Sequence, residues 1–325
     1  MTKNWNDLPD EMKEMVVDNM DIVTRFRLKM CSKSDKRLVE SIQFYCDEVK
    51  VQEKSSSNLQ FRISHAGFSC EVKMFDSNVR VLNLRSGEIR CIPTSSEDEA
   101  VETIKSMFFA FILTKNVRIS RFSVDLDPDV LFPSLDVKLH VKHLDVGKDA
   151  EKWLDMVDSK IQGLTIRNKI NGLGKHQVVK SVNCLQVYKK NNIDDEQLIG
   201  LKATKLEISY SKITDKGVNQ FIKKMIDEDY PIGSSMKFIH NTFNWDKLID
   251  GLNTEVIDND NNDDADNFRY DTVFDEDLDY DDENEEVDCN IARVTMSAKK
   301  DIIITLPMTR RHQHRGNLHL EVVKR

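Results

Sequence analysis

The sequence lacks the features of a secreted, membrane-spanning or disulfide-stabilised protein. The longest uninterrupted apolar run, residues 107–113, is far too short to cross a bilayer. The N-terminal stretch 1–10 has no apolar core of the kind found in secretory signals. No two cysteines form a C-x-x-C pair, which argues against a disulfide framework and a zinc site. The six are Cys31, Cys46, Cys70, Cys91, Cys184 and Cys289. We therefore expect a reduced, soluble, intracellular protein in the cytoplasm, the nucleus or both.

The sequence also lacks the common motifs of catalysis and nucleotide binding. Neither the nucleophile motif G-x-S-x-G nor the dinucleotide motif G-x-G-x-x-G occurs. The run "GLGKH" at residues 172–176 looks like half of a phosphate-binding loop. However, Lys169 stands where that loop needs glycine, and His176 stands where it needs serine or threonine. A turn is the better interpretation, and we predict a chain without catalytic residues or a cofactor.

Two patterns resemble metal sites only superficially. Acids match the calcium-loop template at four positions, Asp275, Asp277, Asp279 and Glu286. Tyr280 stands where the template needs glycine for its sharp turn, and a tract this acidic matches by accident. His140 and His143 are three residues apart in a strand-like run and would point to opposite faces. We therefore predict no metal site.

The charge of the chain is concentrated in one segment. The formal net charge is −9, but residues 258–288 hold sixteen acids and one base, which gives −15. The rest of the chain is therefore +6 (−9 minus −15). We expect residues 256–290 to form an acidic mobile loop, because its charges repel one another and its few apolar residues cannot build a core.

The basic cluster at residues 310–315, which includes His312 and His314, is interpreted as a turn between strands and could contact a phosphate or an acidic partner. Nucleic acid is not expected as a partner, because the rest of the chain shows no concentrated basic stripe.

Residues 8–42 have the spacing of three short amphipathic helices. Pro9 suits the first helical position, and Asp21 can cap the second helix. Ser34 or Asp35 can open the third helix. The apolar positions recur at helical spacing and are Met12, Met15, Val16, Met20, Ile22, Phe26, Met30, Leu38, Val39 and Ile42.

From residue 47 the period changes from 3.6 to 2, which predicts strands. The alternating runs are residues 47–52, 59–64, 69–75 and 79–85, with a turn expected at 86–88. Residues 94–115 begin with a capping signature and then read as a mostly buried helix. Three further strand-like runs close the chain at residues 292–298, 301–307 and 318–324.

The middle of the chain repeats a Leu-x-Val/Ile pattern at intervals of 20, 21 and 21 residues. It occurs at Leu144, Leu164, Leu185 and Leu206, and each run is followed by a helix-like or polar stretch. Phe122 and Lys237 mark a possible earlier and later unit. A strand and a helix at this period are typical of leucine-rich repeats, in which neighbouring units stack their strands side by side. Chance periodicity is the alternative. The predicted fold class is α/β: three N-terminal helices, a degenerate leucine-rich-repeat-like domain and added antiparallel strands.

Two stretches resemble known families. Leu8-Pro9-Asp10-Glu11 and the run "RFRLKMCSK" at residues 25–33 resemble the F-box, in a form common in nematode families. Asp35 and Lys36 stand near the position where many F-boxes have tryptophan. Residues 206–226 and 287–303 are similar to the nematode F-box-associated domain of type 2.

We expect the chain to divide into five parts. They are an F-box (1–46), a β-rich segment plus helix (47–115), the repeat-like associated domain (116–255), the acidic loop (256–290) and the closing strands (291–325).

The F-box resemblance implies docking on the Skp adaptor and, through it, on a cullin. The chain would then be a non-catalytic subunit of a Skp–cullin–F-box ubiquitin ligase that binds a target protein through its C-terminal domain. The physics agrees, because a forty-residue helical unit without disulfides or metal buries too little surface to be stable alone. Its apolar excess should therefore face something else, and methionines adapt well to a partner's groove. The expected adaptor contacts are Leu8, Pro9, Met12, Val16, Ile22, Phe26, Leu28, Cys31 and Leu38, with Arg25 and Lys29 at the rim.

Two alternatives stay open at this stage. In the first, the helices pack onto the rest of the chain and only cap the end of a repeat-based scaffold without a ligase role. The second, an enzyme, has the least support from the residues. The identity of the target and the face of the repeat domain that binds it cannot be read from the sequence.

Overall fold

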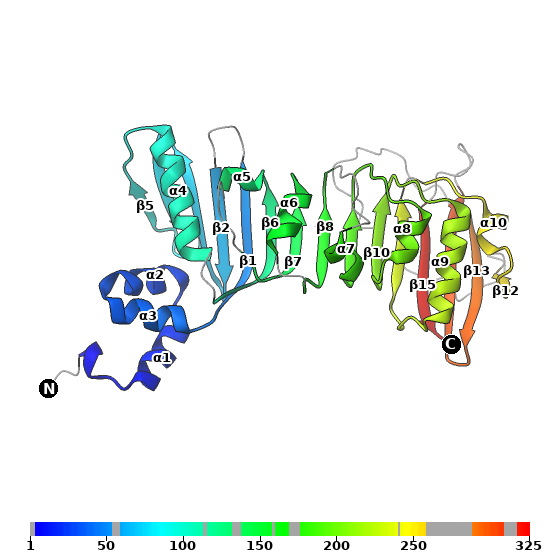
Figure 1. Ribbon diagram of the computed structural model, residues 1–325, viewed down its shortest axis with the longest axis horizontal. Coiled ribbons are helices and arrows are strands. Elements are labelled where there is room, and N and C mark those ends of the chain that lie inside the picture. Colours follow the sequence, from blue (N-terminus) through cyan, green and yellow to red (C-terminus); the bar gives the residue numbers. More distant parts are fainter. Residues whose placement is uncertain are drawn as a thin grey trace. The chain divides into compact units, whose positions relative to one another are not determined.

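The computed structural model describes residues 4–53, 59–112, 116–131, 138–157, 160–168, 176–239, 241–257, 288–308 and 317–325. The chain folds as two compact units, Met1–Asn168 and Lys169–Arg325, whose helices and strands are labelled in Figure 1. Within the described ranges, no helix is both long and apolar enough to cross a membrane.

The first unit contains the N-terminal helices and a mixed sheet. Its elements are η1 (Trp5–Asp7), α1 (Asp10–Asp18), α2 (Ile22–Cys31), α3 (Lys33–Ser41), β1 (Phe44–Glu53), β2 (Leu59–His65), β3 (Phe68–Phe75), β4 (Asn78–Asn83), β5 (Ile89–Ile92), α4 (Glu97–Ile112), β6 (Val117–Asp125), α5 (Pro128–Leu131), β7 (Val141–Val146), α6 (Ala150–Met156) and β8 (Gly163–Ile166).

Side-chain caps fix where the second and third N-terminal helices begin. The Asp21 carboxylate accepts a hydrogen bond from the Thr24 backbone N–H at 2.9 Å, so α2 begins at the predicted residue. The third helix begins earlier than predicted: Ser32, and not Ser34 or Asp35, caps α3 and accepts from the Asp35 N–H at 3.0 Å. Helices α2 and α3 pack against each other, and α1 contacts α3.

The strands of the first unit lie in the order β8-β7-β6-β1-β2-β3-β4-β5. Strand β1 is antiparallel to β2 and parallel to β6, so one chain segment joins a meander to a parallel sheet. The predicted alternation places Val49, Val51 and Phe61 in the core and their strand neighbours on the other face. Helix α4 covers the apolar face, where the rings of Phe61 and Phe108 meet edge to face at 5.6 Å.

The parallel strands carry the repeated apolar positions in register. Phe122 of β6 lies opposite Leu144 of β7, which lies opposite Leu164 of β8. Trp153 of α6 packs edge to face on Phe122 at 5.5 Å and donates its indole N–H to the Leu126 carbonyl at 2.9 Å. This is the side-by-side arrangement that the repeat period predicts.

The second unit continues the strand–helix alternation and then closes with antiparallel strands. Its elements are α7 (Gln177–Ser181), β9 (Cys184–Val187), α8 (Asp195–Gly200), β10 (Lys205–Ser209), α9 (Asp215–Asp227), β11 (Ser235–Ile239), α10 (Trp245–Ile249), β12 (Thr254–Ile257), β13 (Asp288–Ser297), β14 (Lys300–Met308) and β15 (Leu318–Lys324).

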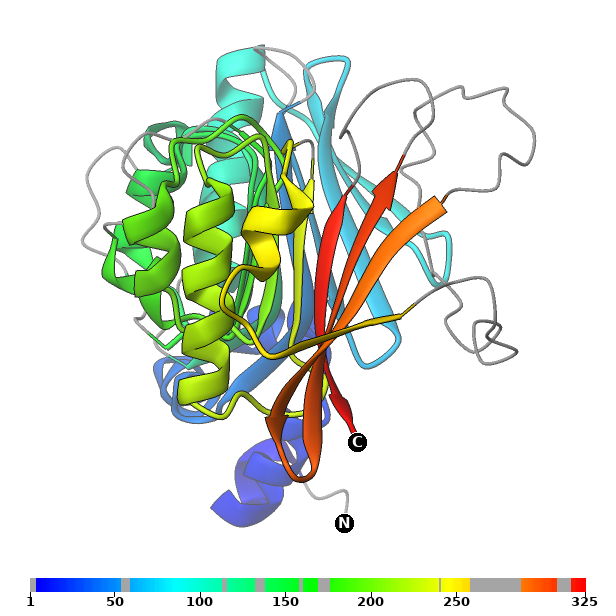
Figure 2. The same cartoon turned by 90° about the vertical axis from the view of Figure 1, so that its right-hand side faces the viewer.

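The sheet of the second unit has the strand order β12-β13-β14-β15-β11-β10-β9. Leu185, Leu206 and Met236 lie in register on the parallel strands β9, β10 and β11. Strand β15 adds antiparallel to β11, and β14, β13 and β12 follow it outward. Helix α9 packs on one face of this sheet (Figure 2). The predicted fold class, α/β with N-terminal helices and added antiparallel strands, is confirmed. The five-part domain division stays a prediction.

Candidate docking surface on the N-terminal helices

Helix α1 turns a row of apolar side chains to solvent. Met12, Met15 and Val16 are 50%, 68% and 42% exposed, whereas Val17 is fully buried. Residues three or four positions apart share one face of a helix, so these three form a continuous surface, here called the apolar stripe. Just before the helix, Pro9 is exposed and Leu8 is half-buried.

A second group of accessible side chains lies towards the end of α2 and on α3. Met30 is 74% exposed, Cys31 is exposed, and Leu28 and Leu38 are half-buried. Within the described part of the chain, four of the twelve large apolar side chains that are exposed fall between residues 12 and 30. Exposed apolar surface is therefore concentrated on these helices, which is a mark of an interaction surface.

Two of the residues predicted to contact the adaptor face the chain's own sheet domain. Ile22 is 4% exposed, and the Phe26 ring packs edge to face on Phe111 of α4 with centroids 4.9 Å apart. Both line a cavity of about 30 Å³ whose walls also include Phe44 of β1 and Val117 of β6. The helical spacing identified these side chains as apolar, but spacing cannot tell which protein covers them.

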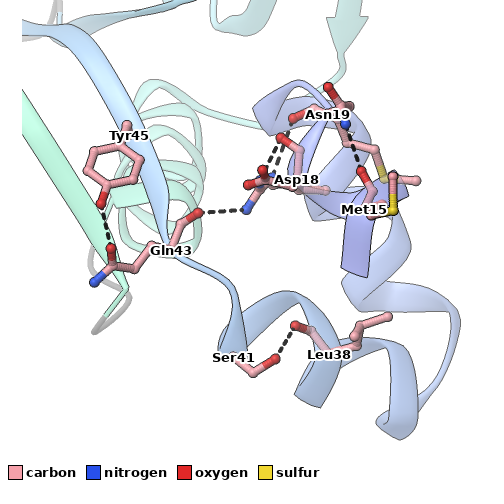
Figure 3. Close-up of polar contacts among 9 residues, drawn as sticks. Met15, Asp18, Asn19, Leu38, Ser41, Gln43 and Tyr45 are labelled. Atoms are coloured by element: carbon pink, nitrogen blue, oxygen red, sulfur yellow. Dashed lines mark hydrogen bonds and ion pairs between the residues drawn. The ribbon is translucent and has the colours of Figure 1, made fainter. Parts of the chain in front are cut away.

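Arg25 is the largest departure from the sequence prediction. It was expected at the rim of the docking surface, but it is 4% exposed and lies over the Phe44 ring at 4.8 Å. Its guanidinium donates to the carbonyls of Asp18, Met20 and Gln43 at 3.1, 3.3 and 3.4 Å. Figure 3 shows Asp18 and Gln43 with the dashed lines that mark these contacts. Burial lowers the pKa of Arg25, and the Asp18 carboxylate acts against that shift.

The contacts of Arg25 join three segments of the chain. Asp18 ends α1, Met20 precedes α2, and Gln43 leads into β1. A buried cation with partners on each segment fixes how the helices leave the first strand. No sequence signal distinguished this arginine from the other bases of α2, because its burial depends on partners at both ends of the helical unit.

Smaller polar contacts brace the same helices. Lys29 was also expected at the rim; its ammonium forms a 3.1 Å ion pair with Glu40 and is largely covered. The indole N–H of Trp5 donates to the Asp35 carboxylate at 2.8 Å. Hydrogen bonds from Ser32 and from Trp5 hold the pKa of Asp35 below its usual value. Trp5 thus contacts the residue that stands near the usual tryptophan position of an F-box, a contact the sequence did not reveal.

The other sequence patterns do not assemble a chemical site among the described residues. No group of three or more His, Cys, Asp or Glu side chains in those ranges could hold a metal ion. His176 accepts a hydrogen bond from the Val178 N–H at 3.2 Å and caps α7. The calcium-loop template, the acidic segment up to residue 287, residues 172–175 of "GLGKH" and the cluster at 310–315 lie outside the described residues.

The helical unit matches the model of a known domain family. The F-box domain model matches residues 5–47, which include η1 and all three N-terminal helices. A second model, that of a domain of unknown function (DUF3557), matches residues 99–241. An uncharacterized F-box protein of Caenorhabditis elegans is 22% identical over 262 residues, which cover 69% of this chain and 67% of the relative. No solved structure matches.

These matches confirm the F-box resemblance and leave the second resemblance untested. The chain carries an F-box, a module of proteins that in general act as non-catalytic adaptors, and neither matched model describes a catalytic family. The DUF3557 match begins within α4 and ends just after β11, so it spans the strands from β6 to β11. It does not identify this region as the F-box-associated domain of type 2.

Proposed function

We propose that this chain is the target-recognition subunit of a Skp–cullin–F-box ubiquitin ligase. Its F-box docks on the Skp adaptor, and the region after the F-box binds the protein to be ubiquitinated. The observation that carries the proposal is the apolar stripe of α1, left exposed inside a segment that matches the F-box model.

The burial pattern favours docking over a purely capping role for the helices. The inner side chains Val17, Ile22 and Val39 are buried within the chain, as either role requires. A helical cap has no need of further apolar surface, whereas Met12, Met15, Val16 and Met30 are left exposed. These side chains, with Leu8, Pro9, Leu28, Cys31 and Leu38, are the proposed adaptor contacts. Ile22 and Phe26 would support that surface from beneath.

The exposed side chains can supply a useful part of a binding free energy. Burying the exposed part of each of the four contributes about 1 kcal/mol. Together they give roughly 4 kcal/mol before the costs of association are subtracted. The adaptor interface therefore needs further contacts around the stripe, which the half-buried Leu8, Leu28 and Leu38 could provide.

The role of the complex follows from proximity and not from chemistry within this chain. A target held on the sheet domain would have its lysines kept near a ubiquitin-conjugating enzyme that the cullin recruits. We further propose that the DUF3557 region and the closing strands serve as the F-box-associated domain that selects this target.

Co-purification with the Skp adaptor tests the proposal. The intact chain should capture the adaptor at near-micromolar concentration, and the double variant Leu8→Ala/Pro9→Ala should capture less. Ile232→Ala is a matched control, because Ile232 is an exposed apolar residue of the second unit, far along the chain from the F-box. Failure of the intact chain to bind, or equal capture by all three proteins, would refute adaptor docking.

A further inference from the structure

The sheet of the first unit has two faces of opposite chemistry. Helices α4, α5 and α6 lie on one face (Figures 1 and 2), which holds buried apolar residues such as Val49, Phe61 and Phe122. The register places the strand neighbours of those residues on the other face. One row across β3, β2, β1 and β6 reads Glu71, Arg62, Lys50 and Ser123.

Cations predominate on this second face. Its basic residues on β1, β2, β3, β4 and β6 include Lys50, Arg62, Lys73, Arg80 and Arg121, here called the cationic face. The acids on the same face of those strands are Glu48, Glu71 and Asp125.

The register brings like charges together at two places. Lys50 lies directly opposite Arg62, and Lys73 lies directly opposite Arg80. Like charges in directly opposite positions destabilise a sheet. Glu71 offsets part of this repulsion, because it forms ion pairs with Arg62 at 3.0 Å and with Lys73 at 2.7 Å. One carboxylate thus serves two cations, and the repulsion between Lys50 and Arg62 remains.

The positive charge is accessible and only partly compensated, because Glu48 is the one acid in register with Arg121. Lys50 and Arg121 are exposed and form no ion pair with another described residue. Arg121 lies in register with His143 of β7. Burial, and then the charges of Lys142 and Arg121, hold the pKa of His143 below its usual value, a shift against the charged form of this histidine.

The apolar residues beside the cationic face suit a polypeptide better than a nucleic acid. Phe75 and Ile89 are 40% and 56% exposed at the β3–β5 end of the sheet. The guanidinium of Arg80 lies 3.2 Å from the centroid of the Phe75 ring and occupies one side of it, so a base cannot stack on that side. Strands are about 4.8 Å apart, so the face from β6 to β4 spans about 19 Å, or roughly six residues of extended chain.

We propose that the cationic face binds an extended acidic segment of a target protein. As an assignment of the target-binding surface, this inference rests on the proposed adaptor function. The binding itself requires only the sheet, so it can be measured on the full chain without the adaptor. Loss of adaptor capture and loss of acidic-peptide binding are therefore separate results.

Fluorescence anisotropy of labelled probes tests the inference. The probes are a peptide of about twelve residues that alternates glutamate and serine, a lysine–serine peptide of equal length, and a thymidine oligonucleotide of similar length. Each is titrated with the full chain at low salt and at about 0.15 M salt. The test variant is Lys50→Glu/Arg121→Glu. Its matched control, Lys212→Glu/Lys216→Glu, makes the same charge change at exposed positions of the second unit.

The acidic peptide should bind best, and its affinity should fall about tenfold or more in the test variant and stay unchanged in the control. Glu71→Gln, which removes an acid from the face, should tighten binding. Lys50→Glu alone should weaken binding and yet raise the unfolding midpoint, because it turns a like-charge pair into an opposite-charge pair. A merely structural role would not give that combination.

Three outcomes would overturn the inference. They are no measurable binding of the acidic peptide, equal loss of affinity in the test variant and its control, and tighter binding of the oligonucleotide than of the peptide. The last result would assign the face to nucleic acid.

Discussion

Replacing Arg25 with methionine should loosen the N-terminal helices from the first strand. The change removes the donor from three carbonyl groups, those of Asp18, Met20 and Gln43. Each lost hydrogen bond costs about 1 kcal/mol, and the contact with the Phe44 ring contributes about 1 kcal/mol more. Methionine fills much of the space and relieves the desolvation of the guanidinium, which offsets part of the loss. We expect a net destabilisation of about 2 kcal/mol, confined to the helical unit.

Hydrogen–deuterium exchange is the suitable assay, because it reports local opening and not only unfolding of the whole chain. A loss of 2 kcal/mol corresponds to about 30-fold faster exchange of protected amides in α1, α2 and α3. Arg27→Met is the matched control, since Arg27 is an exposed arginine of the same helix. Equal exchange in the Arg25→Met and Arg27→Met proteins would refute the conclusion that Arg25 joins the helices to β1.

Three further predictions concern the sheet domain of the first unit. Burial acts to raise the pKa of Glu71, but hydrogen bonds from its two cationic partners hold it below the ordinary value of 4.5. Its ion pairs therefore stabilise the fold above pH 4.5 and are lost as the pH falls through the lowered pKa. Glu71→Gln should cost about 1 kcal/mol at pH 7, and equilibrium unfolding should show this difference vanishing in acid. Burial raises the pKa of Cys46 to about 12, so a thiol reagent at pH 8 should modify exposed Cys31 and Cys91 and leave Cys46 unmodified in the native protein. Phe108→Ala, at a fully buried position on the face of α4 that packs on the sheet, should lower the free energy of unfolding by about 3–5 kcal/mol, as measured by denaturant titration.

Much of the fold could be predicted, because in the strands the spacing of apolar residues along the sequence directly reflects which side chains are buried. The alternating residues predicted β1 and β2, and the structure buries Val49 and Phe61 of these strands. The leucine spacing predicted strands side by side, and Leu144 and Leu164 lie in register on parallel strands. Strand order could not be predicted in the same way. The sequence gives no signal that β1 should pair with β6, which lies beyond an intervening meander and a helix. Such pairings depend on contacts far apart in the chain, which local periodicity does not encode.

The candidate site was predicted in part. Helical spacing identified the apolar positions of α1, and the structure leaves Met12 and Val16 exposed. The same spacing also selected Ile22, which is buried, and gave no indication that Arg25 of α2 is buried against α1 and β1. A pattern can show that a face is apolar or charged. Whether the chain itself covers that face is decided by the tertiary packing of α4 and β1.

Titration calorimetry of the full chain with the purified Skp adaptor tests the central claim most directly. Intact protein should bind with micromolar or tighter affinity, and Met12→Ala/Met15→Ala/Val16→Ala should lose about 3 kcal/mol, or roughly 100-fold, while α2 and α3 keep their native hydrogen-exchange protection. Undetectable binding of the intact chain, or equal affinity of the intact and triple-variant proteins, would contradict the claim that the exposed face of α1 is completed by a partner.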